Sequence, residues 1–472
     1  MTKNIIFILV ALALFSCEDL LEKQDPTQVS KEQALAGNGI EGVAITMYNS
    51  IQGTGYYGAR AMVVGDVLAD NIRATFASNR YASEFDVSPG VGALGYLYGP
   101  IANANVMIAE VDGTEAPEAR KRQLKGEAQF IRGLVYHDLV RNYAYEPGQE
   151  VNGWDAGVIL RTEPVEGADQ ADFRSRATNV EIYQQVETDL LDAITNMDNS
   201  AYPTRASQAS AQALLSRVYL YWGRYNEAIT QATAALNSGT ATLVDTAGYA
   251  DAFHGTLNPE AFFELVYDPI QENVGLNNAL FSVCTSPEDA AGAWGDLVFS
   301  ESLLGVFTDT NDVRLQVTYV DDAGNRRSTK WTGSSGANNV APSEAPSLSN
   351  TWSDNIEVIR YSEVLLIRAE AYAETNQLGL ALADLNELRE NRGVAALSID
   401  NQADMVAAIM EERRRELCFE GHRWFDLKRK GMTIPKSEAA ITSVPYTDFR
   451  ILAPLPQNEV FLNDNLMQNP GY

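Results

Sequence analysis

The feature of this chain that most constrains its fold is an apolar repeat with helical spacing. The first clear segment runs from residue 124 to residue 140, and its apolar face consists of Leu124, Ala128, Ile131, Leu134, Val135, Leu139 and Val140. Apolar residues three or four positions apart lie on one side of an α-helix, which must then be covered by another element. The spacing therefore predicts a helix that packs through one face.

The same pattern occurs twice in quick succession at two later places. Residues 211–222 and 225–236 flank a turn at Gly223-Arg224, and residues 363–374 and 378–389 flank one at Asn376-Gln377. The segment from Trp222 to Ala228 resembles the turn of a tetratricopeptide hairpin, where a small residue lets two helices cross closely. We therefore predict a mostly α-helical fold, in which tetratricopeptide-like hairpins stack into a scaffold.

Two stretches interrupt this pattern. Residues 50–100 are rich in Gly, Tyr, Ser and Asn, and residues 240–355 are long and show little periodicity. Long irregular inserts in a compact domain usually carry function. We expect these two loop-rich regions to form the ligand-binding part of the molecule.

The first residues predict export and a lipid anchor. Lys3 precedes an apolar run over residues 5–15, which is too short to span a bilayer and fits a secretory signal. The run ends in Leu-Phe-Ser-Cys17, which resembles a bacterial lipobox. We predict a signal peptide over 1–16, a lipidated Cys17 with a polar tether to residue 28, and a single domain over 29–472. The alternative is a plain signal peptide with a cysteine there by chance.

Charge and cysteine content exclude several classes of function. The chain has 63 acidic and 35 basic residues, a formal net charge of −28, so it would repel phosphate backbones and we expect no nucleic-acid partner. Three cysteines are too few for a disulfide framework or a CxxC zinc site. Pairing of Cys284 with Cys418 stays open, although Cys418, beside Leu417 and Phe419, is expected to be buried. The three histidines show no metal-binding spacing, so we expect neither a metal nor a cofactor.

Residues 90–95 read Gly-Val-Gly-Ala-Leu-Gly and match the dinucleotide fingerprint GxGxxG. That motif requires a preceding strand, whereas Pro89 precedes it here and no βαβ series surrounds it. A flexible loop is the better interpretation. No GxSxG string is present, so a hydrolase nucleophile elbow has no support.

Residues 412–429 form the densest charged segment, with acidic and basic residues alternating along helical spacing. We interpret it as an ion-paired helix that packs on the scaffold through Leu417, Phe419, Trp424 and Phe425, in preference to a phosphate-binding site.

Several segments together resemble the SusD/RagB family of Bacteroidetes nutrient-binding lipoproteins, over nearly the whole chain. They are residues 66–71 (DVLADN), 97–105 (LYGPIANAN), 127–136 (EAQFIRGLVY), 359–371 (IRYSEVLLIRAEA), 412–429 and the terminal LPQNE and QNPGY strings. Acidic residues directly after Cys17 resemble the surface-export signal of such lipoproteins. One departure is that Leu94 or a neighbour stands where many members have Trp.

The resemblance implies a non-catalytic, surface-exposed protein of the outer membrane, anchored at Cys17. It would capture oligo- or polysaccharide and deliver it to a SusC-like TonB-dependent transporter. Two alternatives stay open: a peptide-binding subunit, as in the RagB branch, and an outer-membrane glycoside hydrolase, which would need two suitably spaced carboxylates.

Sugar rings stack on aromatic side chains, and their hydroxyls bind polar groups. Among the loop residues we predict Trp294, Trp331 and Tyr81 as stacking platforms. Arg73, Asn79 and Asp70 are the predicted hydrogen-bonding partners.

Overall fold

The computed structural model describes most of the chain from Gly39 to Tyr472. The described residues are 39–92, 94–95, 97–165, 172–200, 202–267, 272, 274–333, 352 and 354–472. The predicted signal peptide, Cys17 and its tether lie outside these residues. Among the helices of the described part, none is long and apolar enough to cross a membrane.

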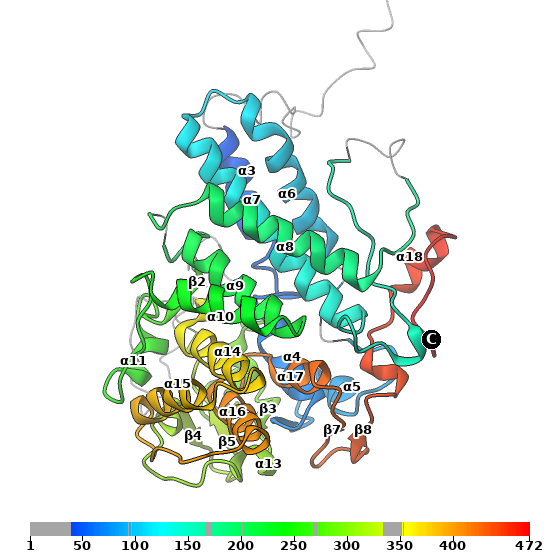
Figure 1. Cartoon of the computed structure of the whole chain (residues 1–472). Coiled ribbons are helices and arrows are strands. Elements are labelled where there is room, and N and C mark those ends of the chain that lie inside the picture. Colours follow the sequence, from blue (N-terminus) through cyan, green and yellow to red (C-terminus); the bar gives the residue numbers. More distant parts are fainter. Residues whose placement is uncertain are drawn as a thin grey trace, which may run out of the picture.

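A continuous stack of antiparallel helices forms one side of the molecule, as the periodicity predicted (Figure 1). Each helix of the stack packs on the next helix of the stack, and the contact of α10 with α14 joins the two halves. The stack comprises α3 (Gly39–Asn49), α6 (Tyr98–Glu110), α7 (Glu118–Tyr143), α8 (Asn179–Asn196), α9 (Gln208–Tyr221), α10 (Tyr225–Leu236), α14 (Tyr361–Glu374), α15 (Leu378–Asn391) and α16 (Gln402–Glu416). The mostly α-helical prediction is confirmed.

The two predicted hairpin turns are confirmed in place, but the glycine is not needed for a close helix crossing, because nothing lies within 4 Å of a Cβ built on Gly223. Gly223, between α9 and α10, has φ +73°, and Asn376, between α14 and α15, has φ +58°. This left-handed conformation reverses the chain in few residues, and glycine and asparagine adopt it at the lowest cost. At the other end of α9, Ser207 and Ser210 form a reciprocal cap that sets where the helix begins.

Short helices and strands make up the irregular side of the molecule. The helices are α4 (Arg60–Leu68), α5 (Ala82–Phe85), α11 (Tyr249–His254), α12 (Leu280–Cys284), α13 (Glu301–Leu304), α17 (Arg423–Arg429) and α18 (Gln457–Leu462). The strands form antiparallel pairs: β1 (Ile72–Ala74) with β3 (Leu297–Phe299), β2 (Ala261–Leu265) with β6 (Ile356–Arg360), β4 (Thr318–Val320) with β5 (Arg326–Ser328), and β7 (Ile434–Pro435) with β8 (Ser443–Val444). The pair β1–β3 therefore joins the two loop-rich regions.

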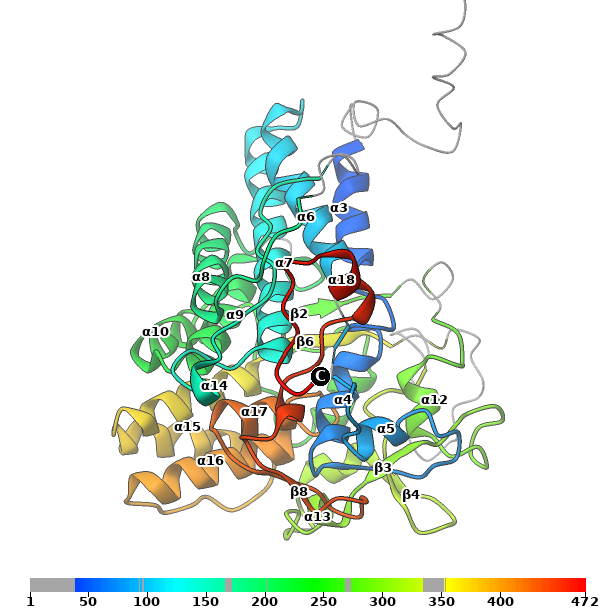
Figure 2. The ribbon, with the colours of Figure 1, turned by 90° about the vertical axis from the view of Figure 1, so that its right-hand side faces the viewer.

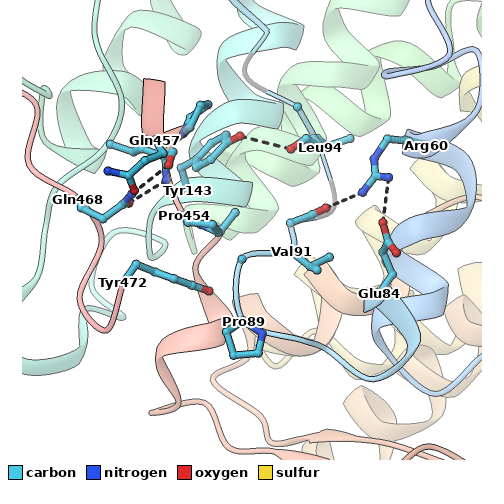
Figure 3. A pocket seen from close by; sticks show the side chains of 16 residues that line it. Arg60, Glu84, Pro89, Val91, Leu94, Tyr143, Pro454, Gln457, Gln468 and Tyr472 are labelled. Atoms are coloured by element: carbon cyan, nitrogen blue, oxygen red, sulfur yellow. Dashed lines mark hydrogen bonds and ion pairs between the residues drawn. The ribbon is translucent and has the colours of Figure 1, made fainter. Parts of the chain in front are cut away.

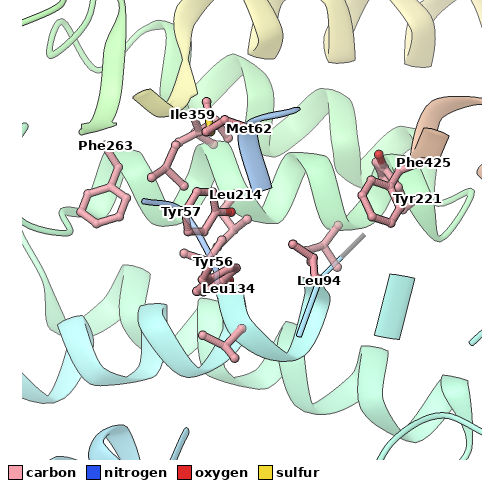
Figure 4. Packing of buried hydrophobic residues seen from close by; sticks show 14 of the residues in the cluster. Tyr56, Tyr57, Met62, Leu94, Leu134, Leu214, Tyr221, Phe263, Ile359 and Phe425 are labelled. Atoms are coloured by element: carbon pink, nitrogen blue, oxygen red, sulfur yellow. The ribbon is translucent and has the colours of Figure 1, made fainter. Parts of the chain in front are cut away.

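One hydrophobic core connects the scaffold to the irregular side. Its members run from Ile40 to Leu466 and come from nearly every helix. Figure 4 shows Met62 of α4, Leu134 of α7, Leu214 of α9 and Phe263 of β2 gathered in it. Cys284 and Cys418 are both buried and both unpaired, which confirms the predicted burial of Cys418.

The charged segment 412–429 is ion-paired and buried, but it is two helices and not one. Phe419 (φ +63°) and Gly421 (φ +78°) form the turn between α16 and α17. A side chain on Gly421 could not fit, because its Cβ would lie 1.8 Å from the Ala61 carbonyl oxygen of α4. The turn is therefore required by the tight crossing of the chain over α4.

Glu416 is at the centre of the buried ion pairs. Arg360 Nη1 lies 2.6 Å from Glu416 Oε1, and Arg392 Nη2 lies 2.9 Å from the same oxygen. Although burial opposes it, the guanidinium groups of Arg392 and Arg360 hold the pKa of Glu416 well below its usual range. Arg360 also forms ion pairs with Glu260 and Glu420.

Candidate functional site

A cleft lies between the loop at residues 89–95 and the C-terminal segment. Its volume is about 680 Å³. The loop contributes Pro89, Gly90, Val91, Gly92, Leu94 and Gly95, and the facing wall consists of residues 453–457 with Gln468 and Tyr472. Arg60, Glu84 and Tyr143 complete the lining (Figure 3). Figure 2 shows the C-terminal segment with α18 crossing the molecule between α7 and α4.

The loop wall is held by side chains from three helices. Arg60 of α4 donates to the carbonyl oxygen of Gly92 at 2.9 Å, and its other nitrogen donates to Glu84 of α5 at 2.9 Å. The carbonyl oxygen of Leu94 accepts from Asn142 at 3.1 Å, near the end of α7. A Cβ on Gly92 would lie 2.5 Å from Cβ of Ala453. The glycine therefore lets the two walls approach each other at the base of the cleft.

The C-terminal wall is tied to α7 by backbone-directed hydrogen bonds. The amide of Ala453 donates to the carbonyl oxygen of Asn142 at 3.0 Å. Asn469 donates both to the carbonyl oxygen of Ala453 at 2.6 Å and to that of Tyr143 at 2.9 Å. The ring of Tyr472 packs edge-on against Phe449 and stays 37% exposed, so it offers a ring surface at the cleft.

A second exposed feature is the Trp294 ledge, which we define as Phe76, Asn79, Arg80, Tyr81 and Trp294. Pairing of β1 with β3 brings its two segments together, and Ser78 then donates to Asp296 at 2.9 Å. The guanidinium carbon of Arg80 lies 4.2 Å from the centre of the Trp294 ring. Phe76 is 47% exposed, and both Phe76 and Asn79 have positive φ.

The ledge contains three of the six residues predicted from the sequence. Trp294 and Tyr81 are half-buried, and Asn79 is exposed. Burial raises the pKa of the Tyr81 hydroxyl above its usual range, so this group is protonated at neutral pH. Arg73 lies nearby on β1, where it donates to Asn325 at 2.6 Å and pairs with Glu438 at 3.1 Å.

The structure places the other two predicted residues in the interior. Trp331 is 2% exposed and packs in the main core, so no face of its ring reaches solvent. Asp70 is 3% exposed and pairs with Arg423 at 2.8 Å and Arg414 at 3.0 Å. Their burial follows from tertiary packing, which neither residue's sequence neighbours indicate. None of the six predicted residues is among the described residues that line the cleft.

The cleft residues were missed because the string at 90–95 was judged only as a nucleotide motif. The structure agrees with rejecting that motif, since helix α5 precedes it and the described strands are paired antiparallel. A usable signal was present: glycines and prolines are dense both in this loop and in the segment Ala453-Pro454-Leu455-Pro456. Their meeting in space could not be read from sequence.

The structure describes the surroundings of all three histidines. His137 and His422 are buried, and burial lowers the pKa of each imidazole, for His422 to about 4. His254 lies 2.7 Å from the carbonyl oxygen of Thr329. Within the described residues, no group of three or more His, Cys, Asp or Glu side chains is arranged to hold a metal ion.

Comparison with known proteins gives consistent results along the chain. Residues 21–220 match a family described as starch-binding and associating with the outer membrane, and residues 305–472 match the SusD family. SusD-like protein P2 of Formosa agariphila is 25% identical over 533 residues, covering 99% of each chain.

Solved structures agree. A SusD superfamily protein of Bacteroides thetaiotaomicron is 25% identical, with a TM-score of 0.79 and coverage of 92% and 99% of the two chains. A laminarin-binding SusD-like protein, 20% identical, shares the fold with a TM-score of 0.72 and coverage of 93% and 100%. These matches confirm the resemblance drawn from the motifs: the chain belongs to the SusD/RagB family.

Proposed function

We propose that the protein captures an oligo- or polysaccharide at the cell surface and delivers it to a SusC-like TonB-dependent transporter. Membership of a family described as starch-binding and outer-membrane-associated supports this role. That a relative of the same fold binds laminarin is compatible with it. The anchor would be the lipidated Cys17, reached through the tether that ends near residue 28.

The observation that carries the proposal is the cleft itself. Its volume of about 680 Å³ lies in the range of small-molecule binding sites. The proline side chains and Tyr472 offer apolar surface for the C–H faces of sugar rings, while exposed Gln457 supplies an amide group for hydroxyls. Because both walls are tied to α7, the site is formed before ligand arrives, which lowers the entropic cost of binding.

Capture without turnover fits the carboxylates of the cleft. Glycoside hydrolysis uses two carboxyl groups on opposite sides of the scissile bond. Among the described lining residues, Glu84 has the single carboxylate side chain, and it is already paired with Arg60. This arrangement supports a binding role over a hydrolytic one.

The Trp294 ledge would extend the binding surface beyond the cleft. Trp294 and Tyr81 stay in the proposal as ring platforms, and Asn79 and Arg73 as polar contacts. Trp331 and Asp70 are left out because they are buried and engaged in the core. Phe76 and Arg80 are added because they are exposed beside the predicted residues.

The test is titration calorimetry of the protein truncated after Cys17, with laminarin, starch and mixed peptides as ligands, and with product analysis of each mixture. Saturable glycan binding without new reducing ends is the expected result. Release of reducing ends would contradict the non-catalytic role. Binding to peptides alone would move the protein to the peptide-importing branch.

A matched pair of variants tests the ledge. Trp294→Ala should weaken glycan binding several-fold, since the stacking contact of an aromatic ring contributes about 1 kcal/mol. Trp222→Ala is the control, because Trp222 is also half-buried beneath an arginine, at 5.0 Å from Arg224, but lies on the helical scaffold. Equal affinity of both variants would remove the ledge from the proposal.

The anchor and partner need separate experiments. Cys17→Ser should abolish incorporation of labelled fatty acid and release the protein from the membrane fraction. The transporter should co-purify with this protein from detergent-solubilised outer membranes of the parent strain. The co-purified band should be absent when the transporter gene is deleted. Retention of the fatty acid in Cys17→Ser would disprove the lipidation site.

A further inference from the structure

The cleft has an unusual charge balance for a protein with so many ionised groups. Among its 16 described lining residues, Arg60 and Glu84 have the charged side chains, and they pair with each other at 2.9 Å. The remaining members of the loop, residues 89–96, include no charged residue in the sequence. The side chains of the described lining are therefore neutral in sum and offer no unpaired cation to an anionic ligand.

Arg60 is not free to leave its partner. One terminal nitrogen donates to Glu84 and the other to the carbonyl oxygen of Gly92, each at 2.9 Å. Glu84 is 7% exposed. Turning Arg60 toward a sulfate or carboxylate in the cleft would leave the Glu84 carboxylate buried without a counter-charge, which is strongly unfavourable. It would also release the loop at Gly92.

We infer that the cleft is selective for uncharged glycan and rejects sulfated or uronic-acid polymers, and that the closed Arg60–Glu84 pair is the determinant of this selectivity. The inference rests on the proposed function. The formal net charge of −28 acts in the same direction, because it repels a polyanion before contact. Neutral sugars meet no such barrier, since their hydroxyls need only amides, carbonyl oxygens and ring surfaces.

The first experiment compares laminarin and starch with the same two polymers after chemical sulfation, by titration calorimetry at fixed ionic strength. The expected result is binding of at least one neutral polymer and at least about tenfold weaker binding of its sulfated form. Tighter binding of a sulfated form would overturn the selectivity while leaving glycan capture intact. Binding of peptides in place of every glycan would instead overturn the proposed function.

The second experiment removes the negative charge from the Arg60–Glu84 pair. Glu84→Gln keeps the size of the side chain but frees the charge of Arg60, so affinity for the sulfated polymer should rise several-fold. The gain should disappear near about 0.5 M NaCl, where exposed charges are screened. Glu163→Gln is the control, because Glu163 also pairs with an arginine, Arg174 at 3.2 Å, but does not line the cleft.

A third variant keeps the inference testable if Glu84→Gln fails to fold. Gln457 is exposed and lines the cleft, so Gln457→Lys adds an unpaired cation without disturbing the core. It should raise affinity for sulfated polymer in the same salt-dependent way. If both variants fold, as judged by thermal unfolding, and neither gains affinity, the pair is not the determinant and the inference fails.

Discussion

The ion pairs around Glu416 and the single ion pair beside the cleft use the same chemistry for opposite purposes. Around Glu416, buried arginines from β6 and from the end of α15 converge on carboxylates of α16. At the cleft, one pair closes on itself at the edge of a neutral, glycine-rich hollow. Around Glu416, several shared ion pairs hold β6, α15 and α16 together. At the cleft, the single Arg60–Glu84 pair positions the loop and leaves no unpaired charge on either side chain.

The burial of each region explains the difference. The side chains of Arg360 and Glu416 are at most 2% exposed, so each charge depends on the others for its solvation. The Arg60 side chain is 31% exposed and keeps contact with water. We therefore expect mutations in the first region to act on folding and mutations in the second to act on ligand choice.

The largest effect is expected from breaking the buried region. Arg360→Met leaves Glu260, Glu416 and Glu420 short of a cation in the core. The free energy of unfolding should fall by about 3–5 kcal/mol, measured from urea-induced unfolding. The control Arg174→Met, at an exposed pair, should change it by less than about 1 kcal/mol. Equal stability of the two variants would refute the structural role of the buried charges.

A second effect concerns the turn that brings those charges into place. Gly421→Ala should destabilise the protein by about 2–4 kcal/mol, because the new methyl group meets the Ala61 carbonyl and φ is +78°. Gly379→Ala on α15 is the control, since nothing lies within 4 Å of its Cβ. That control should be neutral or slightly stabilising. Urea midpoints of the two variants distinguish the outcomes.

The cleft should respond in affinity and not in stability. A Cβ on Gly95 would meet only the Leu97 side chain, at 4.0 Å, so Gly95→Trp can place its ring in the open space. Glycan affinity should fall about tenfold, which equals about 1.4 kcal/mol, with an unchanged melting temperature. Gly113→Trp, at the exposed end of a short 3-10 helix, is the control. Unchanged affinity would show that the ligand binds elsewhere.

The smallest effect is expected from a third arrangement of charged groups, in which two buried carboxyl groups lie opposite each other on paired strands. Glu264 and Glu357 are paired across β2 and β6, and Asn258 and Asn355 donate to them. Burial raises the pKa of Glu264 to about 7 and that of Glu357 to about 8, the latter with help from the charge of Glu264.

These raised pKa values set the direction of the pH dependence. Between the ordinary value of 4.5 and about 8, these two carboxyl groups hold more protons in the folded state than in the unfolded state, so their contribution to stability falls as pH rises through this window. Glu357→Gln should remove much of this loss and be more stable than the parent at pH 8, on the order of 1 kcal/mol. Unfolding curves at pH 5 and pH 8 measure it. A stability difference between parent and Glu357→Gln that is the same at pH 5 and pH 8 would contradict the raised pKa values.

What the sequence determined by itself is local and periodic. The helical repeats predicted the scaffold, and Gly223 and Asn376 predicted two of its turns, because φ preference and side-chain spacing depend on near neighbours. Ordered motifs identified the family. The sequence also indicated that residues 412–429 are ion-paired, since opposite charges three apart, such as Glu412 and Arg415, lie on one side of a helix.

The tertiary structure decided which side chains reach solvent and which distant segments meet. Trp294 and Trp331 look alike as loop tryptophans, yet only packing makes one half-exposed and buries the other. The cleft needs Gly92 and Ala453, from opposite ends of the chain, to approach within contact distance. Burial and juxtaposition depend on contacts between residues far apart in sequence, so the local spacing of residue types cannot predict them.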